Sequence, residues 1–161
     1  MDRIAQFYKV SKEQWSQEVP GAAGYDDIKL PQRATAGSAG YDFYSTMTFR
    51  LAPGESIKVP TGIRCRMDIG WVLLIFPRSG LGFKYQMGFA NEIPVIDQDY
   101  FSSSNEGHIM LKIVNRGDKI LDIEAGQAFA QGILLPFGIT TDDNTTTIRD
   151  GGFGSTDKKE S

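Results

Sequence analysis

The fold is decided by the stretch Ile63-Arg64-Cys65-Arg66-Met67 and by its neighbour Trp71-Val72-Leu73-Leu74-Ile75-Phe76. The first alternates apolar and polar residues with a period of two, which predicts a strand with one buried face. The second is apolar throughout, as in a strand that is covered on both faces. Outward from this pair, the sequence predicts further short strands at 41–45, 55–59, 87–90, 108–114, 119–123 and 127–135.

Glycine and proline, 18 and 7 of the 161 residues, separate these segments. Beyond residue 20 no stretch free of both is longer than 12 residues, which excludes an all-helical protein. Typical turn sequences are Ala52-Pro53-Gly54-Glu55 and Asn115-Arg116-Gly117-Asp118. Many short strands separated by such turns indicate a β-sandwich, a jelly roll or a barrel.

The two ends of the chain differ from the middle. Residues 1–24 form an N-terminal extension in which Ser11 and Gln14 fit a capping box, so we expect a short helix from about Lys12 to Val19. In this box Ser11 is the N-cap, and the Gln14 side chain returns to the Ser11 amide. Residues 25–139 form the β domain. Residues 140–161 form a C-terminal arm that begins with a polar, flexible linker, Thr140–Thr147.

Composition removes several classes of protein. The longest apolar run has six residues, whereas a membrane helix needs about 18. No signal peptide is recognisable, so we expect a cytoplasmic protein. A single cysteine, Cys65, and a single histidine, His108, provide neither an internal disulfide nor a structural zinc site. Cys65 is expected to pack as a small hydrophobic residue, and His108 to be structural or solvent-exposed rather than catalytic. The net charge of −3 argues against direct nucleic-acid binding, which relies on a basic patch.

Five polar or glycine-rich segments are candidates for chemistry: 36–42, 77–82, 91–100, Gln131 and 149–156. In the second, Arg78 stands beside Ser79 and Gly80, which together offer a charged fork, a hydroxyl and accessible amides to a phosphate. Taken singly, each segment is also compatible with ordinary turn or strand-end chemistry. Arg78 could be an ion-pair partner, and Gln131 could satisfy backbone groups.

Taken together, the segments resemble the five motifs of the trimeric deoxyuridine triphosphatase (dUTPase) family. They read Ala-Gly-Ser-Ala-Gly-Tyr-Asp, Pro-Arg-Ser-Gly-Leu, Ile-Asp-Gln-Asp-Tyr, a strand glutamine and Gly-Gly-Phe-Gly-Ser-Thr, in that order, between about residues 28 and 156. The resemblance implies an all-β, jelly-roll-like distorted β-barrel with a mobile C-terminal arm. It also implies a homotrimer whose active sites are each shared among three chains.

The implied activity is Mg²⁺-assisted hydrolysis of dUTP to dUMP and pyrophosphate, which limits uracil incorporation into DNA and supplies dUMP for thymidylate synthesis. Asp97 resembles the carboxylate that activates the attacking water, and Asp42 the one that reaches Mg²⁺ through water. Tyr100 matches the ring beneath deoxyribose, Asn91 the uracil hairpin and Phe153 the aromatic that stacks on uracil. The residues matched to the phosphates are Arg78, Ser79, Gly80 and Gln131, together with Arg149, Gly154, Ser155 and Thr156 of the arm.

The sequence departs from the family pattern at three places. Phe101–Gly107 looks like an insertion after Tyr100, Pro94 replaces a common glycine, and the arm is one residue shorter after Arg149. Two alternatives stay open. One is a dCTP deaminase-like enzyme of the same fold, and the other is a dUTPase scaffold with an added regulatory role, in which the insertion or the N-terminal segment docks a protein partner.

Overall fold

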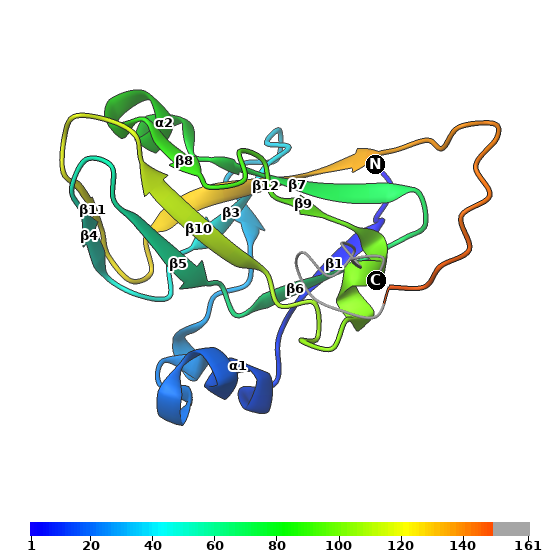
Figure 1. Cartoon of the computed structure of the whole chain (residues 1–161), viewed down its shortest axis with the longest axis horizontal. Helices are drawn as coiled ribbons and strands as arrows, with labels where there is room; N and C mark the ends of the chain where they lie inside the picture. Colours follow the sequence, from blue (N-terminus) through cyan, green and yellow to red (C-terminus); the bar gives the residue numbers. More distant parts are fainter. Residues whose placement is uncertain (150–161) are drawn as a thin grey trace, which may run out of the picture.

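The structure is a computed structural model that describes residues 1–149 and consists mainly of β-strands (Figure 1). Every predicted strand is present: β3 (Tyr41–Tyr44), β5 (Ser56–Pro60), β6 (Ile63–Met67), β7 (Trp71–Pro77), β8 (Met87–Phe89), β10 (Met110–Asn115), β11 (Leu121–Ile123) and β12 (Ala128–Pro136). The described residues also contain strands that were not predicted, namely β1 (Ala5–Lys9), β2 (Gln32–Arg33), β4 (Phe49–Leu51) and β9 (Val95–Ile96).

The largest sheet has the strand order β2-β3-β12-β7-β9, and all of its neighbours are antiparallel. On its inner face Phe43, Leu73 and Ile75 are fully buried. Gly132 of β12 lies among them, and a Cβ there would come within 2.9 Å of the Leu73 and Phe43 side chains. This sheet therefore supplies one wall of the core.

The outer face of the same sheet is apolar but only partly covered. It presents Val72, Leu74 and Phe76 of β7, each of intermediate burial, in register with residues of β12. We predicted β7 to be covered on both faces. In the single chain the prediction holds for the inner face only, because no other element of the described chain packs fully over the outer one.

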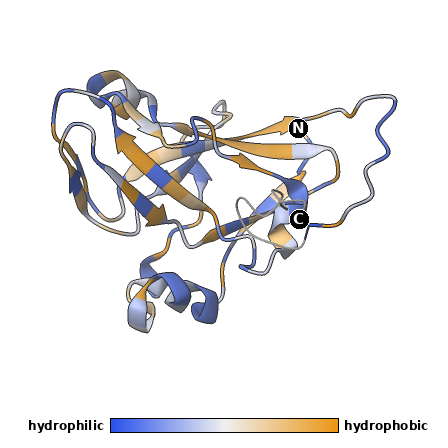
Figure 2. Ribbon diagram, in the orientation of Figure 1, coloured by the Kyte–Doolittle hydropathy of each residue, from blue (hydrophilic) through white to orange (hydrophobic). Residues whose placement is uncertain are grey.

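The remaining strands form a three-stranded sheet, β5-β10-β8, and the pairs β11-β4 and β1-β6. Their buried residues, with those of the large sheet, make one continuous core, and hydrophobic segments run along β7, β10 and β12 (Figure 2). The hydrogen-bonded sheets do not join into one closed barrel within residues 1–149. The all-β, jelly-roll-like fold is confirmed, whereas barrel closure is looser than expected. Within the same range, no helix is long and apolar enough to span a membrane.

The predicted N-terminal helix is present as α1 (Lys12–Glu18), followed by the short 3-10 helices η1 (Pro20–Ala22) and η2 (Tyr25–Asp27). The Ser11 hydroxyl accepts the Gln14 amide at 3.0 Å, as the capping box predicts. The reciprocal half of the box is wrong. The Ser11 amide donates instead to the Glu106 carboxylate at 2.8 Å, because an ionised carboxylate is a stronger acceptor than a neutral amide.

Two further helical segments were not expected. α2 (Ser79–Tyr85) forms despite two glycines, and it begins where the Arg78 carbonyl accepts the amides of Leu81 and Gly82. The 3-10 helix η3 (Gln98–Ser102) follows Asp97. The two segments lie at opposite ends of β7 (Figure 1), with Arg78 directly before α2 and Asp97 directly before η3.

Candidate functional site

The first cluster, called here the Asp42 cluster, consists of Asp42, Arg78 and Gln131. Asp42 of β3 and Gln131 of β12 are direct partners across the sheet. The Arg78 Nε lies 3.3 Å from an Asp42 carboxylate oxygen, and the Gln131 amide donates to the Pro77 carbonyl at 3.3 Å. Three strands thus bring one carboxylate, one guanidinium and one amide to the same edge of the sheet.

Two neighbouring segments shape the Asp42 cluster. At Gly40 an added Cβ would lie 2.5 Å from the Gln131 side-chain oxygen, so only glycine leaves room for this glutamine. Ser79 and Gly80 form the first turn of α2, where amides have no acceptor inside the helix. Arg78 is 45 % exposed, so its guanidinium can reach a ligand from solvent.

The second cluster, called here the Asp97 cluster, consists of Asp97, Asp99, Tyr100 and Arg149. The Arg149 guanidinium contacts an Asp97 carboxylate oxygen at 2.5 Å and an Asp99 oxygen at 2.9 Å. It also lies over the Tyr100 ring, 5.8 Å from the centroid. The Arg149 side chain is 15 % exposed, so this residue of the arm lies against the cluster.

Tyr100 is nearly fully buried in the middle of η3. Its hydroxyl donates to the His108 carbonyl and accepts from the Asn105 amide, both at 2.8 Å. Burial raises the pKa of Tyr100, against the opposing effects of the Asn105 hydrogen bond and the Arg149 charge. The phenol is therefore neutral, and it is held in place by the residues of the insertion.

Asn91 lies in the exposed loop between β8 and β9. These two strands pair with β10 and β7 respectively, so the loop is not the hairpin that the resemblance implied. Arg116 holds this loop through paired contacts to the Glu92 carboxylate, at 2.7 and 2.9 Å, and a 2.8 Å bond to the Phe89 carbonyl. Pro94 is compatible with the loop because its carbonyl accepts the Ile75 amide at 3.0 Å. The turn is therefore fixed although proline has no amide donor.

The two clusters are far apart within one chain. Ile96, directly before Asp97, pairs with Leu73, and Arg78 is five residues further along β7, or ~17 Å at ~3.4 Å per residue. Neither a hydrogen bond nor one bridging water spans such a gap. The family resemblance assigned both clusters to one active site but shared that site among three chains, so it did not require the clusters to meet within one chain.

The lone histidine and cysteine lie in the interior. His108 is fully buried, its Nε2 accepts the Gly62 amide at 2.9 Å, and desolvation lowers its pKa to about 4. Burial raises the pKa of Cys65 to about 12. The imidazole is neutral and the thiol is protonated near pH 7. The expected packing of Cys65 is confirmed, and of the two alternatives for His108 the structure has the buried one.

Some site residues were missed, and others are not described. Asp99 could have been predicted from the sequence, because Asp97 and Asp99 form a conspicuous pair of carboxylates. Arg64, Asn105 and Glu106 gave no local signal, since their contacts span long stretches of chain or lie in the insertion. Phe153, Gly154, Ser155 and Thr156, which we matched to the family's last motif, lie outside the described residues.

The Asp42 cluster offers a divalent ion only one carboxylate. Within residues 1–149 no group of three or more acidic, histidine or cysteine side chains gathers to bind a metal. Asp42 contributes one carboxylate, which already contacts Arg78. This donor set fits a Mg²⁺ that keeps most of its waters and is carried mainly by phosphate oxygens, because Mg²⁺ dehydrates reluctantly.

Comparison with known proteins identifies a family. The family model described as dUTPase matches residues 26–157. The deoxyuridine 5'-triphosphate nucleotidohydrolase of Lactococcus lactis subsp. lactis (strain IL1403) is 39 % identical over 132 residues, 80 % of this chain and 88 % of that protein. The protein of the same name from Tolumonas auensis is 37 % identical over 138 residues, 81 % and 88 % of the two chains.

Solved structures agree with the fold. The crystal structure of dUTPase from Streptococcus mutans superposes with a TM-score of 0.65 at 32 % identity, over 83 % of this chain and 97 % of that one. The dUTPase from phage phi11 of S. aureus superposes with a TM-score of 0.66 over 91 % and 98 % of the chains. Its sequence identity is 20 %, so this second likeness bears on the fold alone.

Proposed function

Because the chain belongs to the dUTPase family, we propose that it hydrolyses dUTP to dUMP and pyrophosphate. The observation that carries the proposal is the arrangement of the two clusters. One presents an arginine, a glutamine and first-turn amides to a phosphate chain, and the other presents an exposed carboxylate next to a buried tyrosine ring.

Asp97 is the proposed general base. It removes a proton from the water that attacks the α-phosphorus, a role that typically contributes about 10² to 10⁴ in rate. Its carboxylate is half exposed and follows β9 directly, so a water molecule can approach it from solvent. Arg149 must first leave Asp97, and we propose that the substrate phosphates draw it away.

Arg78, Ser79, Gly80 and Gln131 are the proposed ligands of the phosphate chain, together with Arg149, Gly154, Ser155 and Thr156 of the arm. Placement and charge neutralisation supply most of the acceleration in phosphoryl transfer. Asp42 would hold Mg²⁺ through water, and that ion, bound to the triphosphate, neutralises part of its charge. Arg78 would then exchange its contact with Asp42 for one with phosphate.

Selection of the nucleoside is proposed to depend on shape. Asn91, on the loop that Arg116 holds, would contact the uracil edge, where the 5-methyl group of thymine does not fit. The Tyr100 ring would pack beneath deoxyribose and leave no room for a 2′-hydroxyl. Phe153 would stack on uracil, an interaction of about 1–3 kcal/mol by analogy with other base-stacking proteins.

The proposed assembly is a homotrimer with shared active sites. A gap of ~17 Å between the clusters of one chain is bridged if a second chain brings its Asp97 cluster to the first chain's Asp42 cluster. The outer face of the large sheet supports self-association, because it continues from Asp42 and Gln131 as an incompletely covered apolar surface. Its apolar members are Val72, Leu74, Phe76, Val95, Ile133 and Leu135.

We propose that the enzyme works in the cytoplasm, where it limits uracil incorporation into DNA and supplies dUMP for thymidylate synthesis. The support for this location is the substrate itself, because a nucleoside triphosphate carries several negative charges and does not cross membranes unaided.

One assay tests the activity. Pyrophosphate release is measured with dUTP, dTTP, dCTP and UTP, and ammonia release is measured in parallel. We expect pyrophosphate from dUTP, with the other nucleotides far slower. Ammonia from dCTP would instead identify the alternative, a deaminase of the same fold.

A further inference from the structure

Three side chains of the N-terminal segment, residues 1–24, contact the insertion that follows Tyr100, or contact His108, the residue directly after the insertion. The Tyr8 ring packs against Phe101 with centroids 5.8 Å apart. Ser11 binds Glu106, and Trp15 lies against His108 with centroids 5.9 Å apart. Trp15 is 1 % exposed and belongs to the core, so these contacts are structural parts of the fold.

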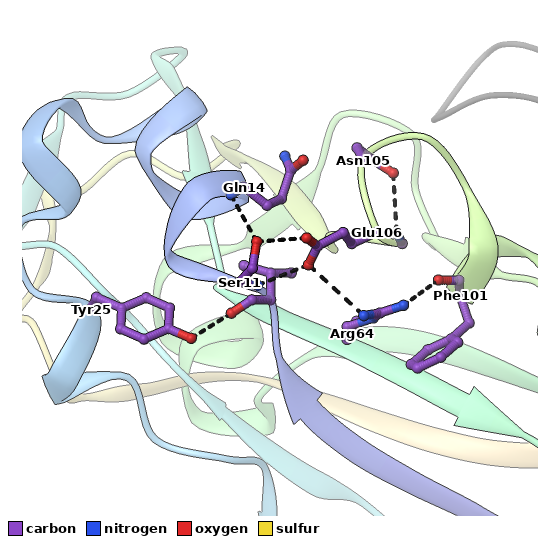
Figure 3. A network of polar contacts seen from close by, with 9 residues as sticks. Ser11, Gln14, Tyr25, Arg64, Phe101, Asn105 and Glu106 are labelled. Atoms are coloured by element: carbon purple, nitrogen blue, oxygen red, sulfur yellow. Dashed lines mark hydrogen bonds and ion pairs between the residues drawn. The ribbon is translucent and has the colours of Figure 1, made fainter.

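The contact between Ser11 and Glu106 is the most specific of the three (Figure 3). The Ser11 hydroxyl donates to one carboxylate oxygen at 2.6 Å, and the Ser11 amide donates to the other at 2.8 Å. Desolvation acts to raise the pKa of Glu106, but the two Ser11 hydrogen bonds and the Arg64 charge outweigh it and lower the pKa. The carboxylate is therefore ionised at neutral pH, and its hydrogen bonds are charge-assisted.

Arg64 extends the same network to the start of the insertion. One of its terminal nitrogens lies 3.8 Å from the Glu106 carboxylate, and the other donates to the Phe101 carbonyl at 2.7 Å. The guanidinium also stacks on the Phe101 ring, 3.7 Å from the centroid. Glu106 itself adopts φ +59°, a left-handed conformation that is unfavourable for glutamate. The anchored carboxylate holds the loop in this conformation.

The insertion in turn holds Tyr100. Asn105, directly before Glu106, donates to the Tyr100 hydroxyl, and that hydroxyl donates to the His108 carbonyl. Gly107 lies so close that a Cβ there would be 2.6 Å from the Tyr100 carbonyl oxygen. A chain of contacts therefore runs from Ser11 through Glu106 and its neighbours to the Tyr100 ring.

We propose that the N-terminal segment is a positioning element of the active site, with Ser11 and Glu106 as positioning residues that fix the Tyr100 ring for selection of deoxyribose over ribose. The segment precedes the part of the chain that matches the family, which begins at residue 26. The inference rests on the proposed function of Tyr100. It also means that one side of the insertion is covered by the chain's own N-terminal segment.

The test compares the specificity ratio, kcat/KM for dUTP divided by kcat/KM for UTP, in the full-length protein. Both values refer to the same preparation, so a loss of folded enzyme cancels from the ratio. Ser11→Ala and Glu106→Gln are expected to lower the ratio by about two- to tenfold, the effect of losing one hydrogen bond. Ser11→Thr, which keeps the hydroxyl and is a good N-cap, is expected to restore it.

A matched control is available on the same helix. Ser16 is exposed and its hydroxyl donates only locally, to the Glu13 carbonyl at 2.8 Å. Ser16→Ala is the same chemical change without a contact to the insertion, and it is expected to leave the ratio unchanged. If Ser11→Ala lowers the melting temperature but leaves the ratio at the wild-type value, the segment is merely stabilising and the inference is wrong.

A further variant separates this inference from the proposed function. Tyr100→Ala removes the ring and is expected to lower the ratio more than either positioning variant. If Tyr100→Ala leaves the ratio unchanged, Tyr100 does not select the sugar. Both the proposed role of Tyr100 and the positioning role of Ser11 and Glu106 are then wrong. If Tyr100→Ala lowers the ratio while Ser11→Ala and Glu106→Gln do not, the function of Tyr100 stands and the positioning role is refuted.

Discussion

Arg149, the last residue that the structure describes, forms an ion pair with Asp97, the proposed general base of the same chain. The sequence led us to expect Arg149 on the substrate phosphates, close to Arg78. Its guanidinium instead neutralises the carboxylate that would take a proton from water. Substrate must therefore compete with Asp97 for Arg149 before the reaction can begin.

Asp99 offers a way to weaken this competition without altering Asp97. It contacts the Arg149 Nε at 2.9 Å, and its side chain is 50 % exposed. Ion pairs of such exposure contribute about 0.2–1 kcal/mol, so Asp99→Asn is expected to lower KM for dUTP by up to about fivefold. Steady-state kinetics at two salt concentrations measure the change, which should shrink at high salt. A KM that stays at the wild-type value would show that the pair does not oppose binding.

Asp97→Asn tests the general base. Asparagine has nearly the same shape but cannot accept the proton, so turnover should fall by about 10² to 10⁴. Assembly and nucleotide affinity should persist, as measured by light scattering and by titration with dUTP. Normal hydrolysis by this variant would refute the assigned mechanism.

Gly40→Ala tests the proposed contact of Gln131 with phosphate. The new Cβ would displace the end of the Gln131 side chain, which is flexible, so we expect KM for dUTP to rise with little change in melting temperature. The double variant Gly40→Ala/Gln131→Ala is the control. If glycine acts through the glutamine, adding Gly40→Ala to Gln131→Ala has no further effect on KM. Additive effects would contradict this coupling.

His108 predicts a pH dependence of stability. Its pKa is about 4 in the folded chain, against 6.5 for a free histidine. As the pH falls, His108 is therefore protonated in the unfolded chain before it is protonated in the folded chain. The contribution of neutral His108 to the free energy of unfolding is complete above pH 6.5 and is lost as the pH falls towards 4. The loss amounts to about 3 kcal/mol.

The measurement compares the free energy of unfolding of the wild type and of His108→Gln between pH 7 and pH 4. Glutamine retains an acceptor for the Gly62 amide but does not titrate. We expect the wild type to lose more stability than the variant over this range. Parallel curves for the two proteins would mean that another group causes the acid sensitivity.

Gly107→Ala tests how tightly the insertion packs on Tyr100. Gly107 has φ +70°, and its neighbours within 3 Å of an added Cβ are backbone atoms of Tyr100 and Phe101, which cannot move aside. Gly54, with φ +82° and open space around it, is the matched control. We expect Gly54→Ala to cost about 1–2 kcal/mol from backbone strain and Gly107→Ala distinctly more, as measured by chemical denaturation. Equal costs would show that the loop relaxes.

Local sequence pattern predicted the strands well, because alternation and apolar runs reflect burial directly. β6 has the predicted bounds, and β7 differs by one residue. β1 was missed because its sequence, Ala5–Lys9, has no glycine, proline or clear alternation, and its strand form comes from pairing with β6. α2 was missed because its two glycines disfavour a helix; its first turn closes through the bonds of the Leu81 and Gly82 amides to the Arg78 carbonyl.

The sequence motifs predicted which residues meet in the Asp42 cluster, but not how far this cluster lies from Asp97 within one chain. Asp42, Arg78 and Gln131 meet because they lie on, or directly after, strands that pair with one another. The distance between this group and Asp97 depends on strand register, which motif order does not reveal. Likewise, the acceptor of the Ser11 amide is Glu106 and not the predicted Gln14, because a contact forms between residues 95 positions apart in the sequence.

The pairing of β1 with β6 turns Cys65 into an internal reporter. Cys65 stands opposite Phe7 in this pairing, and its thiol is buried and protonated near neutral pH. A thiol reagent can reach it only when the core around β6 opens, so the rate of labelling counts these openings. Since the chain has one cysteine, opening of the core beside the β1-β6 pair can be followed without adding a probe.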